Sequence, residues 1–261
     1  MRHERRWPGI PSIDSIPHHE RTATDLEAPT MTTIPVTQSP VELVADYFGR
    51  AISSLESWKP LLAADIAAAR AAGPFTSEKL DDLVEPYAHR TFDSLELPVY
   101  GAGFIAALDS LADAGSHLAW WQGAERTKLV LASQSVNKEH IDYSELEWYR
   151  VPQATGEAHV AGPYVDYLCS DEYTITVAAP VAIDDDFVGV AGLDLLIDRV
   201  EHDLTPRLAV FDAHVTIING VGRVLLSTDA RRETGDTLRG SDLDAFERHP
   251  CPGMALEVLL H

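Results

Sequence analysis

The chain has 261 residues, 45% of them hydrophobic, and its 41 acidic against 20 basic residues give it a formal net charge of -21. This apolar content is typical of a protein with a packed core, whereas the charge repels phosphate backbones and anionic lipid headgroups. We therefore expect neither nucleic acid nor a membrane among its partners. No apolar run approaches the roughly 18 residues of a membrane-spanning helix, and the basic N-terminus lacks the apolar region of a secretion signal, so a cytoplasmic location is expected.

Residues 1–38 are rich in proline and show neither a helical nor a strand period. Their apolar content is too low to offset the entropy lost on ordering. We predict a disordered extension that contributes nothing to the folded domain.

A long N-terminal helix is predicted over residues 39–74. Ser39 can cap it, with Pro40 at its first position, Glu42 completing a capping box and Gly73 at its end. Its apolar residues recur mostly three or four apart, and they are Val41, Val44, Phe48, Ile52, Leu55, Leu62 and Ile66. This band is wider than one helix seam requires, so we expect the helix to pack partly on its own sheet and partly on a second copy, which makes a homodimer.

Residues 75–208 are predicted to form an α+β domain. A shorter helix lies around residues 80–87, and short segments rich in β-branched and aromatic residues follow from Pro98. Turn residues at 123–126 and 184–186 join consecutive strands as hairpins, and without βαβ alternation an antiparallel sheet is expected. The candidate strands are Val99–Ile105, His117–Gln122, Lys128–Ser133, Tyr173–Ile183 and Phe187–Leu195.

The C-terminal part, residues 209–261, is expected to be a partial second module or a C-terminal hairpin. A helix near residues 200–208 precedes it, and residues 215–227 are typical of a hairpin around the turn Asn219–Gly220. The chain that remains is too short for a complete second domain.

Residues 148–194 hold the densest group of aromatic, acidic and glycine residues. Tyr164 and Asp166 are two positions apart, so in an extended segment their side chains lie on one face. Asp194 ends an apolar strand, where a carboxylate needs a partner or a polar ligand. The alternative interpretation is a strand-end cap or salt bridge for Asp194, and ordinary core for Trp148 and Tyr149.

Motifs of common enzymes and metal sites are missing from the sequence. It has no HExxH, GxSxG or GxxxxGK[ST] motif, and no GxGxxG after a strand. Cys169 and Cys251 lack a metal-binding spacing, and the histidines are scattered. We therefore expect no cofactor, no metal and no catalytic residues.

Four stretches carry a resemblance to a known family. They are Glu147–Tyr149, Gly162–Asp166, Tyr173–Thr176 with Ala179–Val181, and Phe187–Asp194. In order and spacing they resemble the Cache, or PDC-sensor, family of ligand-binding domains. With the long helix and the late hairpin, the resemblance covers residues 40–238. Typical members are flanked by transmembrane helices and signalling modules, so this chain is similar to a stand-alone version.

The resemblance implies a PAS-like sheet, with a small ligand between the sheet and the loops and helix over it. Its aromatic and acidic residues, which hold amino groups, correspond here to Trp148, Tyr149, Tyr164, Asp166 and Asp194. Amino-acid-binding members have an arginine two positions before the tryptophan, where this chain has Leu146. Arg150 or Arg126 is a candidate replacement. Two carboxylates without that arginine favour an amine as the ligand.

Three functional hypotheses remain open from the sequence. The first is a small-molecule-binding sensor domain. The second is a small α+β enzyme that uses Asp166, Asp194 and a nearby His or Tyr as acid and base. The third is a dimerisation protein that binds no ligand.

Overall fold

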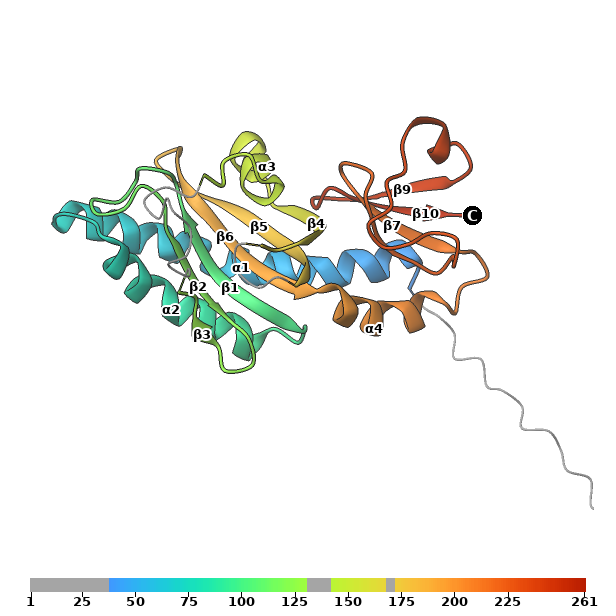
Figure 1. The fold of residues 1–261 in the computed structure, drawn as a ribbon, viewed down its shortest axis with the longest axis horizontal. Helices are drawn as coiled ribbons and strands as arrows, with labels where there is room; N and C mark the ends of the chain where they lie inside the picture. The colour runs from blue at the N-terminus through green and yellow to red at the C-terminus, as the bar shows by residue number, and fades with distance from the viewer. Residues whose placement is uncertain (1–37, 131–141, 168–171) are drawn as a thin grey trace, which may run out of the picture. The chain divides into compact units, whose positions relative to one another are not determined.

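The computed structural model describes residues 38–130, 142–167 and 172–261, and the chain from Thr37 onward forms one compact unit. In Figure 1, the helices α1 (Pro40–Ala72) and α2 (Ser77–Ser94) lie on one side of a six-stranded sheet, the short helix α3 (Glu147–Thr155) lies on the other, and a smaller sheet forms the C-terminal part. The α+β fold with a long first helix is confirmed. The predicted disorder of residues 1–38 lies outside the described residues, except at residue 38.

Helix α1 spans Pro40–Ala72 and begins at the predicted capping box. The backbone N–H of Ser39 donates to Glu42 Oε2 over 2.7 Å, and the N–H of Glu42 donates to Ser39 Oγ over 3.2 Å. The apolar band of the helix is buried within its own chain, at Leu43, Val44, Tyr47, Phe48, Ala51, Leu55, Trp58, Leu62 and Ile66. Val41 and Ile52 of the predicted band are only partly buried against this core, and the homodimer stays a prediction.

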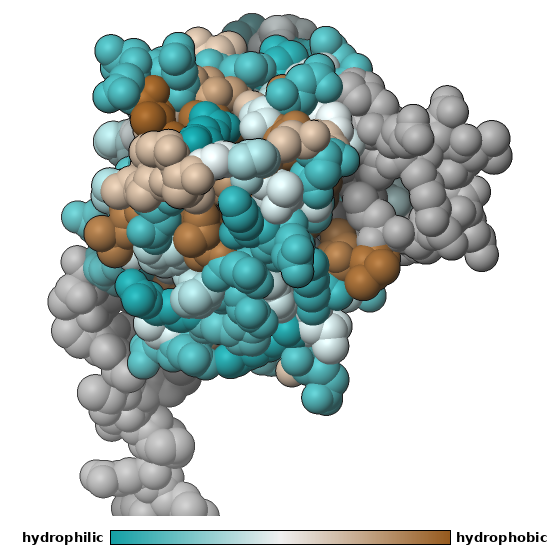
Figure 2. Space-filling model, turned by 90° about the vertical axis from the view of Figure 1, so that its left-hand side faces the viewer, coloured by the Kyte–Doolittle hydropathy of each residue, from teal (hydrophilic) through white to brown (hydrophobic). Residues whose placement is uncertain are grey.

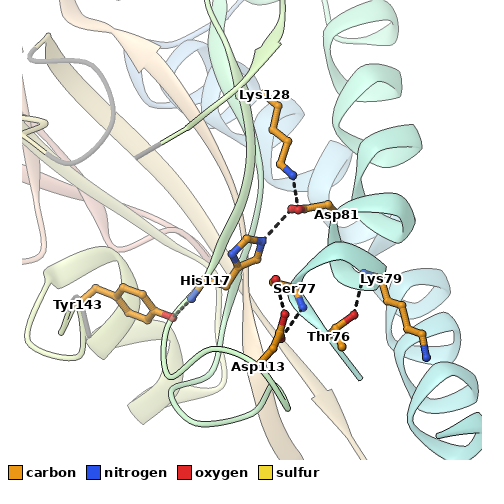
Figure 3. A network of polar contacts seen from close by, with 8 residues as sticks. All are labelled: Thr76, Ser77, Lys79, Asp81, Asp113, His117, Lys128 and Tyr143. Carbon is orange, nitrogen blue, oxygen red and sulfur yellow. Dashed lines mark hydrogen bonds and ion pairs between the residues drawn. The ribbon is translucent and has the colours of Figure 1, made fainter. Parts of the chain in front are cut away.

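Helix α2 (Ser77–Ser94) is fastened to the sheet by a buried carboxylate. Asp81 accepts a hydrogen bond from His117 Nε2 over 2.8 Å and pairs with Lys128, as Figure 3 shows. At the start of the helix, Asp113 accepts from both the N–H and the hydroxyl of Ser77 at 2.8 Å. These contacts join the helix to strand β3 (Thr127–Lys128) and to the loop of residues 107–117.

The main sheet is antiparallel, with the order β3-β2-β1-β6-β5-β4. Four of the five predicted strands lie within two residues of their expected bounds. The fifth, expected at 128–133, is described only as β3 at 127–128, and residues 131–133 lie outside the described residues. The strands are β1 (Val99–Ala106), β2 (Leu118–Gln122), β3 (Thr127–Lys128), β4 (His159–Val165), β5 (Tyr173–Ile183) and β6 (Asp186–Leu196).

Alternation along the central strands divides the core into two clusters. Ile175, Val177, Leu193 and Leu195 belong to the large cluster that includes α1 and α2. Because successive side chains of a strand point to opposite faces, Asp194 lies on the other face. That face carries a smaller, aromatic-rich cluster beneath α3.

Helix α3 (Glu147–Thr155) and strand β4 were not predicted from the sequence. Helix α3 has nine residues, contains Pro152 and lacks a side-chain cap at its start, so no helix signal of ordinary strength marks it. Strand β4 is broken by a bulge at Gly162, whose φ of 103° favours glycine. These two elements form one side of the candidate site.

After helix α4 (Ile197–Leu208), the C-terminal part forms a four-stranded sheet of order β8-β7-β10-β9. The predicted hairpin is present as β7 (Val215–Asn219) and β8 (Val224–Ser227). A 3₁₀ turn (Gly240–Leu243) then leads to a second hairpin that was not predicted, β9 (Glu247–Cys251) and β10 (Leu256–Leu260).

Figure 2 views the molecule from the left-hand side of Figure 1, and there apolar residues form separate patches among hydrophilic ones.

Candidate functional site

A small inner cavity lies on the α3 side of the main sheet. Two carboxylates, Asp166 and Asp194, face it together with polar and aromatic side chains. Its volume is about 20 Å³, which is room for about one water molecule. The residues that line it are Ile105, Leu118, Trp120, Trp148, Tyr164, Asp166, Thr176 and Asp194.

Asp194 is held by a chain of hydrogen bonds that starts on β4. Asp194 on β6 pairs directly with Thr176 on β5, and Thr176 Oγ1 donates to Asp194 Oδ1 over 2.6 Å. Because the single hydroxyl proton of Thr176 is used in that bond, the Tyr164 hydroxyl must donate to Thr176 Oγ1. These two hydrogen bonds in series fix Oδ1 of Asp194. Oδ2 of the same carboxylate forms no hydrogen bond with any described residue.

The inner cavity favours the neutral form of Asp194. Asp194 is 3% exposed and Asp166 is 5% exposed. Burial raises the pKa of the Asp194 carboxyl from 3.8 to about 8, the charge of Asp166 adds to the rise, and the hydrogen bond from Thr176 opposes it. A cation placed between the two carboxylates would favour their charged forms. Such a strongly shifted carboxyl in a cavity is typical of a functional site.

Trp120 lies flat on a part of the sheet that is made of glycines. An ideal Cβ on Gly101 would lie 2.6 Å from Trp120 Nε1, and one on Gly192 would lie 3.3 Å from Trp120 Cζ3. The indole therefore spans β1 and β6 beside Asp194, which pairs with Gly101. Its N–H group is buried and makes no hydrogen bond with any described residue. A buried donor without a partner is costly, and Trp120 is thus a site residue that was not predicted from the sequence.

A larger outer cleft adjoins the inner cavity and has a volume of about 330 Å³. The two spaces share Trp148, Tyr164 and Asp166. Tyr164 and Asp166 thus border the same spaces, as their spacing predicts, and Val165 between them also lines the outer cleft. The other residues of the outer cleft are Leu146, Glu147, Gly162, Pro163, Val165, Tyr167 and Arg223.

The other predicted site residues lie outside the two spaces. Tyr149 is 2% exposed and packs behind Trp148, with its ring centroid 5.4 Å from that of Phe187 and 5.0 Å from that of Tyr143. Arg150 is exposed on α3 and lines neither space. Arg126 pairs with Asp93 and lies over the Phe92 ring, away from the site.

Metal-binding clusters and membrane-spanning helices are both absent from the described part of the chain. In residues 38–130, 142–167 and 172–261, no three His, Cys, Asp or Glu side chains come together in a way that suits a metal ion. Within the same ranges, no helix has the length and hydrophobicity needed to cross a membrane.

Residues 132–202 match the family model described as methyl-accepting chemotaxis protein-like, first PDC sensor domain. This segment contains α3, β4, β5 and β6, and with them Trp148, Tyr164, Asp166 and Asp194. No curated protein sequence matches the chain.

Several solved structures share the fold. The ligand-binding domain of the Pseudomonas fluorescens chemoreceptor CtaA, in complex with L-valine, has a TM-score of 0.55 at 14% identity, over 85% of this chain and 91% of that chain. The ligand-binding domain of the Pseudomonas aeruginosa amino acid chemoreceptor PctB, in complex with L-Arg, has a TM-score of 0.52 at 17% identity, over 85% and 90%. That of the Campylobacter jejuni chemoreceptor Tlp3, in complex with L-valine, has a TM-score of 0.52 at 15% identity, over 85% and 88%.

These similarities show the fold, and the proteins that share it are sensor domains. The family model matches the part of the chain that carries the two carboxylates and the aromatic residues of the site. The predicted resemblance is thus confirmed over residues 132–202, which match the model of a first PDC sensor domain, and the chain shares its fold with chemoreceptor ligand-binding domains.

Proposed function

We propose that the domain senses a small organic amine and binds its ammonium group in the inner cavity. The observation that carries the proposal is the pair of buried carboxylates, Asp166 and Asp194, in one cavity with Trp120, Trp148 and Tyr164. Asp194, at 3% exposure and with its pKa raised to about 8, needs a cation or a proton to offset its desolvation. An ammonium group in this cavity would supply that charge and would lie beside Asp166 as well.

The aromatic rings add to the affinity for a cation. A well-placed ring contributes about 0.5 to 2 kcal/mol to the binding of an ammonium group, and a charge-assisted hydrogen bond contributes about 1.5 to 3 kcal/mol. The volume of about 20 Å³ suits a group the size of one water molecule. The cavity therefore fits an ammonium head and excludes a larger charged group.

The missing arginine distinguishes this site from one for α-amino acids. Leu146 stands where the arginine was expected, and neither Arg150 nor Arg126 reaches the two spaces. The carboxylate of an α-amino acid lies next to the ammonium group and so would face Asp166 and Asp194. The structures of similar fold bind amino acids, and we propose that this domain prefers amines without an α-carboxylate.

A thermal-shift screen tests the proposal with alkylamines, α-amino acids and organic acids of matched carbon number. A ligand at a hundredfold its dissociation constant stabilises the fold by about 2.7 kcal/mol, so the Tm should rise with the amines alone. Stabilisation by the acids and not by the amines would refute the assignment. Turnover of a stabilising amine, followed by mass spectrometry, would instead support an enzyme.

A further inference from the structure

The inner cavity is too small for a whole ligand, so the remainder must lie in the outer cleft. A ligand that enters the inner cavity with its head passes between Trp148, Tyr164 and Asp166, which line both spaces. Its body then lies against Leu146 and Val165, two partly exposed apolar side chains that line the outer cleft. The side chains of the outer cleft therefore select the part of the ligand beyond its ammonium group.

One arginine in the outer cleft comes from the C-terminal sheet. Arg223 stands between β7 and β8 and lines the cleft together with Glu147 and Gly162 of the main domain. Arg223 is exposed, and its guanidinium forms no salt bridge or hydrogen bond with any described residue. Burial raises the pKa of Tyr173, and the positive charge of Arg223 opposes this rise. Arg223 therefore acts on the electrostatics of its surroundings. The cleft therefore contains a cation that lacks a protein partner in the described chain.

A buried asparagine fixes the turn that carries Arg223 to the wall of the cleft. Asn219 is 2% exposed, and its Oδ1 accepts from the backbone N–H of Arg223 over 2.9 Å. Its Nδ2 donates to the Gly162 carbonyl over 2.7 Å and to Glu147 Oε1 over 3.3 Å. Glu147 Oε1 also lies 2.9 Å from His159 Nε2. Because Gly162 and Glu147 line the cleft, these bonds hold the backbone of Arg223 in place beside it.

We infer that Arg223 belongs to the ligand site and selects ligands that carry a carboxylate, or a similar acceptor group, at the end remote from the ammonium group. The inference rests on the proposed function. Asp194 lines only the inner cavity and Arg223 lines only the outer cleft, so these two opposite charges stand in different spaces, while Asp166 borders both spaces and Glu147 lines the outer cleft. An ω-amino acid matches this order of charges, whereas an α-amino acid places both of its charges at one end.

Isothermal titration calorimetry with three five-carbon probes distinguishes a preference for simple amines, for ω-amino acids and for α-amino acids. The probes are pentylamine, 5-aminopentanoate and L-norvaline. The four- and six-carbon ω-amino acids and alkylamines are added, so that one chain length spans the site. We expect the best ω-amino acid to bind about tenfold more tightly than the alkylamine of equal length, which corresponds to about 1.4 kcal/mol. L-Norvaline should bind most weakly of the three.

Arg223→Ala removes the guanidinium at an exposed position, so the variant should fold. We expect it to lose the advantage of the ω-amino acid and to retain its affinity for the alkylamine. Arg223→Glu should invert the order, so that the diamine of equal length binds more tightly than the ω-amino acid. Arg199→Ala is the matched control, because Arg199 is an exposed arginine of α4 that lines neither space.

Two results would overturn the role of Arg223 while leaving the proposed function intact. One is that alkylamines bind but ω-amino acids of every length bind no more tightly, and the other is that Arg223→Ala keeps their advantage. If ω-amino acids bind through Arg223 while no alkylamine binds, the role of Arg223 stands and the amine proposal fails. If none of the probes binds, both are overturned.

Discussion

Thr176 and Asp194 lie opposite each other on neighbouring strands, and the hydroxyl of Thr176 donates a 2.6 Å hydrogen bond to the buried carboxylate. Among the described residues, this bond lowers the pKa of Asp194, against burial and the charge of Asp166, which raise it. It therefore determines how readily Asp194 becomes charged when a cation arrives.

Thr176→Val keeps the shape of the side chain and removes this hydrogen bond. The pKa of Asp194 should rise further, so the affinity for an alkylamine at pH 7 should fall by about tenfold, close to the contribution of one charge-assisted hydrogen bond. Titration calorimetry measures the change. Thr216→Val is the control, because Thr216 is a buried threonine in the C-terminal sheet whose hydroxyl bonds to Ser227. Equal losses in both variants would show that the effect is not local to Asp194.

The raised pKa of Asp194 also makes stability depend on pH. Its pKa is about 8 in the folded chain against 3.8 ordinarily. Between these values the folded state holds a proton that the unfolded state has lost, so the free energy of unfolding falls as pH rises across that window. Denaturant unfolding at pH 5 and pH 8 measures this change. The free energy of unfolding should fall more between these two pH values for the wild type than for Asp194→Asn, which has no carboxyl group to ionise at this position. Identical losses would mean that Asp194 ionises normally.

Gly101 makes room for the Trp120 indole. A Cβ at this position would lie 2.6 Å from Trp120 Nε1, so Gly101→Ala should displace the ring beside Asp194 and weaken alkylamine binding. Gly49→Ala is the contrasting variant, because nothing lies within 4 Å of the added Cβ in α1. It should raise the free energy of unfolding by about 0.5–1 kcal/mol and leave binding unchanged. Unchanged binding in Gly101→Ala would show that the ring position is unimportant.

The sequence predicted those parts of the site that depend on local spacing. Two positions separate Tyr164 from Asp166, and the apolar run before Asp194 marks its burial. Trp120 was missed because it stands beside Trp121 in an apolar strand, and the local pattern does not tell which of the two rings lies over the cavity. That choice depends on the pairing of β2 with the glycines of β1.

Arg223 and helix α3 are parts of the site that the sequence did not predict, and each shows a physical reason for this. Arg223 reaches the site from a second sheet, and the buried Asn219 that fixes its turn is typical, in sequence, of an ordinary hairpin turn. Helix α3 is short, lacks a side-chain cap and contains a proline, so tertiary packing beneath it decides its conformation. Contacts between distant segments carry no signal in a single sequence.

The most direct test of the site is pentylamine binding, measured by calorimetry in two buffers of different ionisation enthalpy at pH 7. Because Asp194 is largely protonated there in the empty site, with a pKa of about 8, binding of the ammonium group should release up to one proton. Asp194→Asn should lose most of the affinity and all of the proton release, while Asp198→Asn, at an exposed carboxylate on α4, should change neither. Undiminished amine binding by Asp194→Asn would contradict the account.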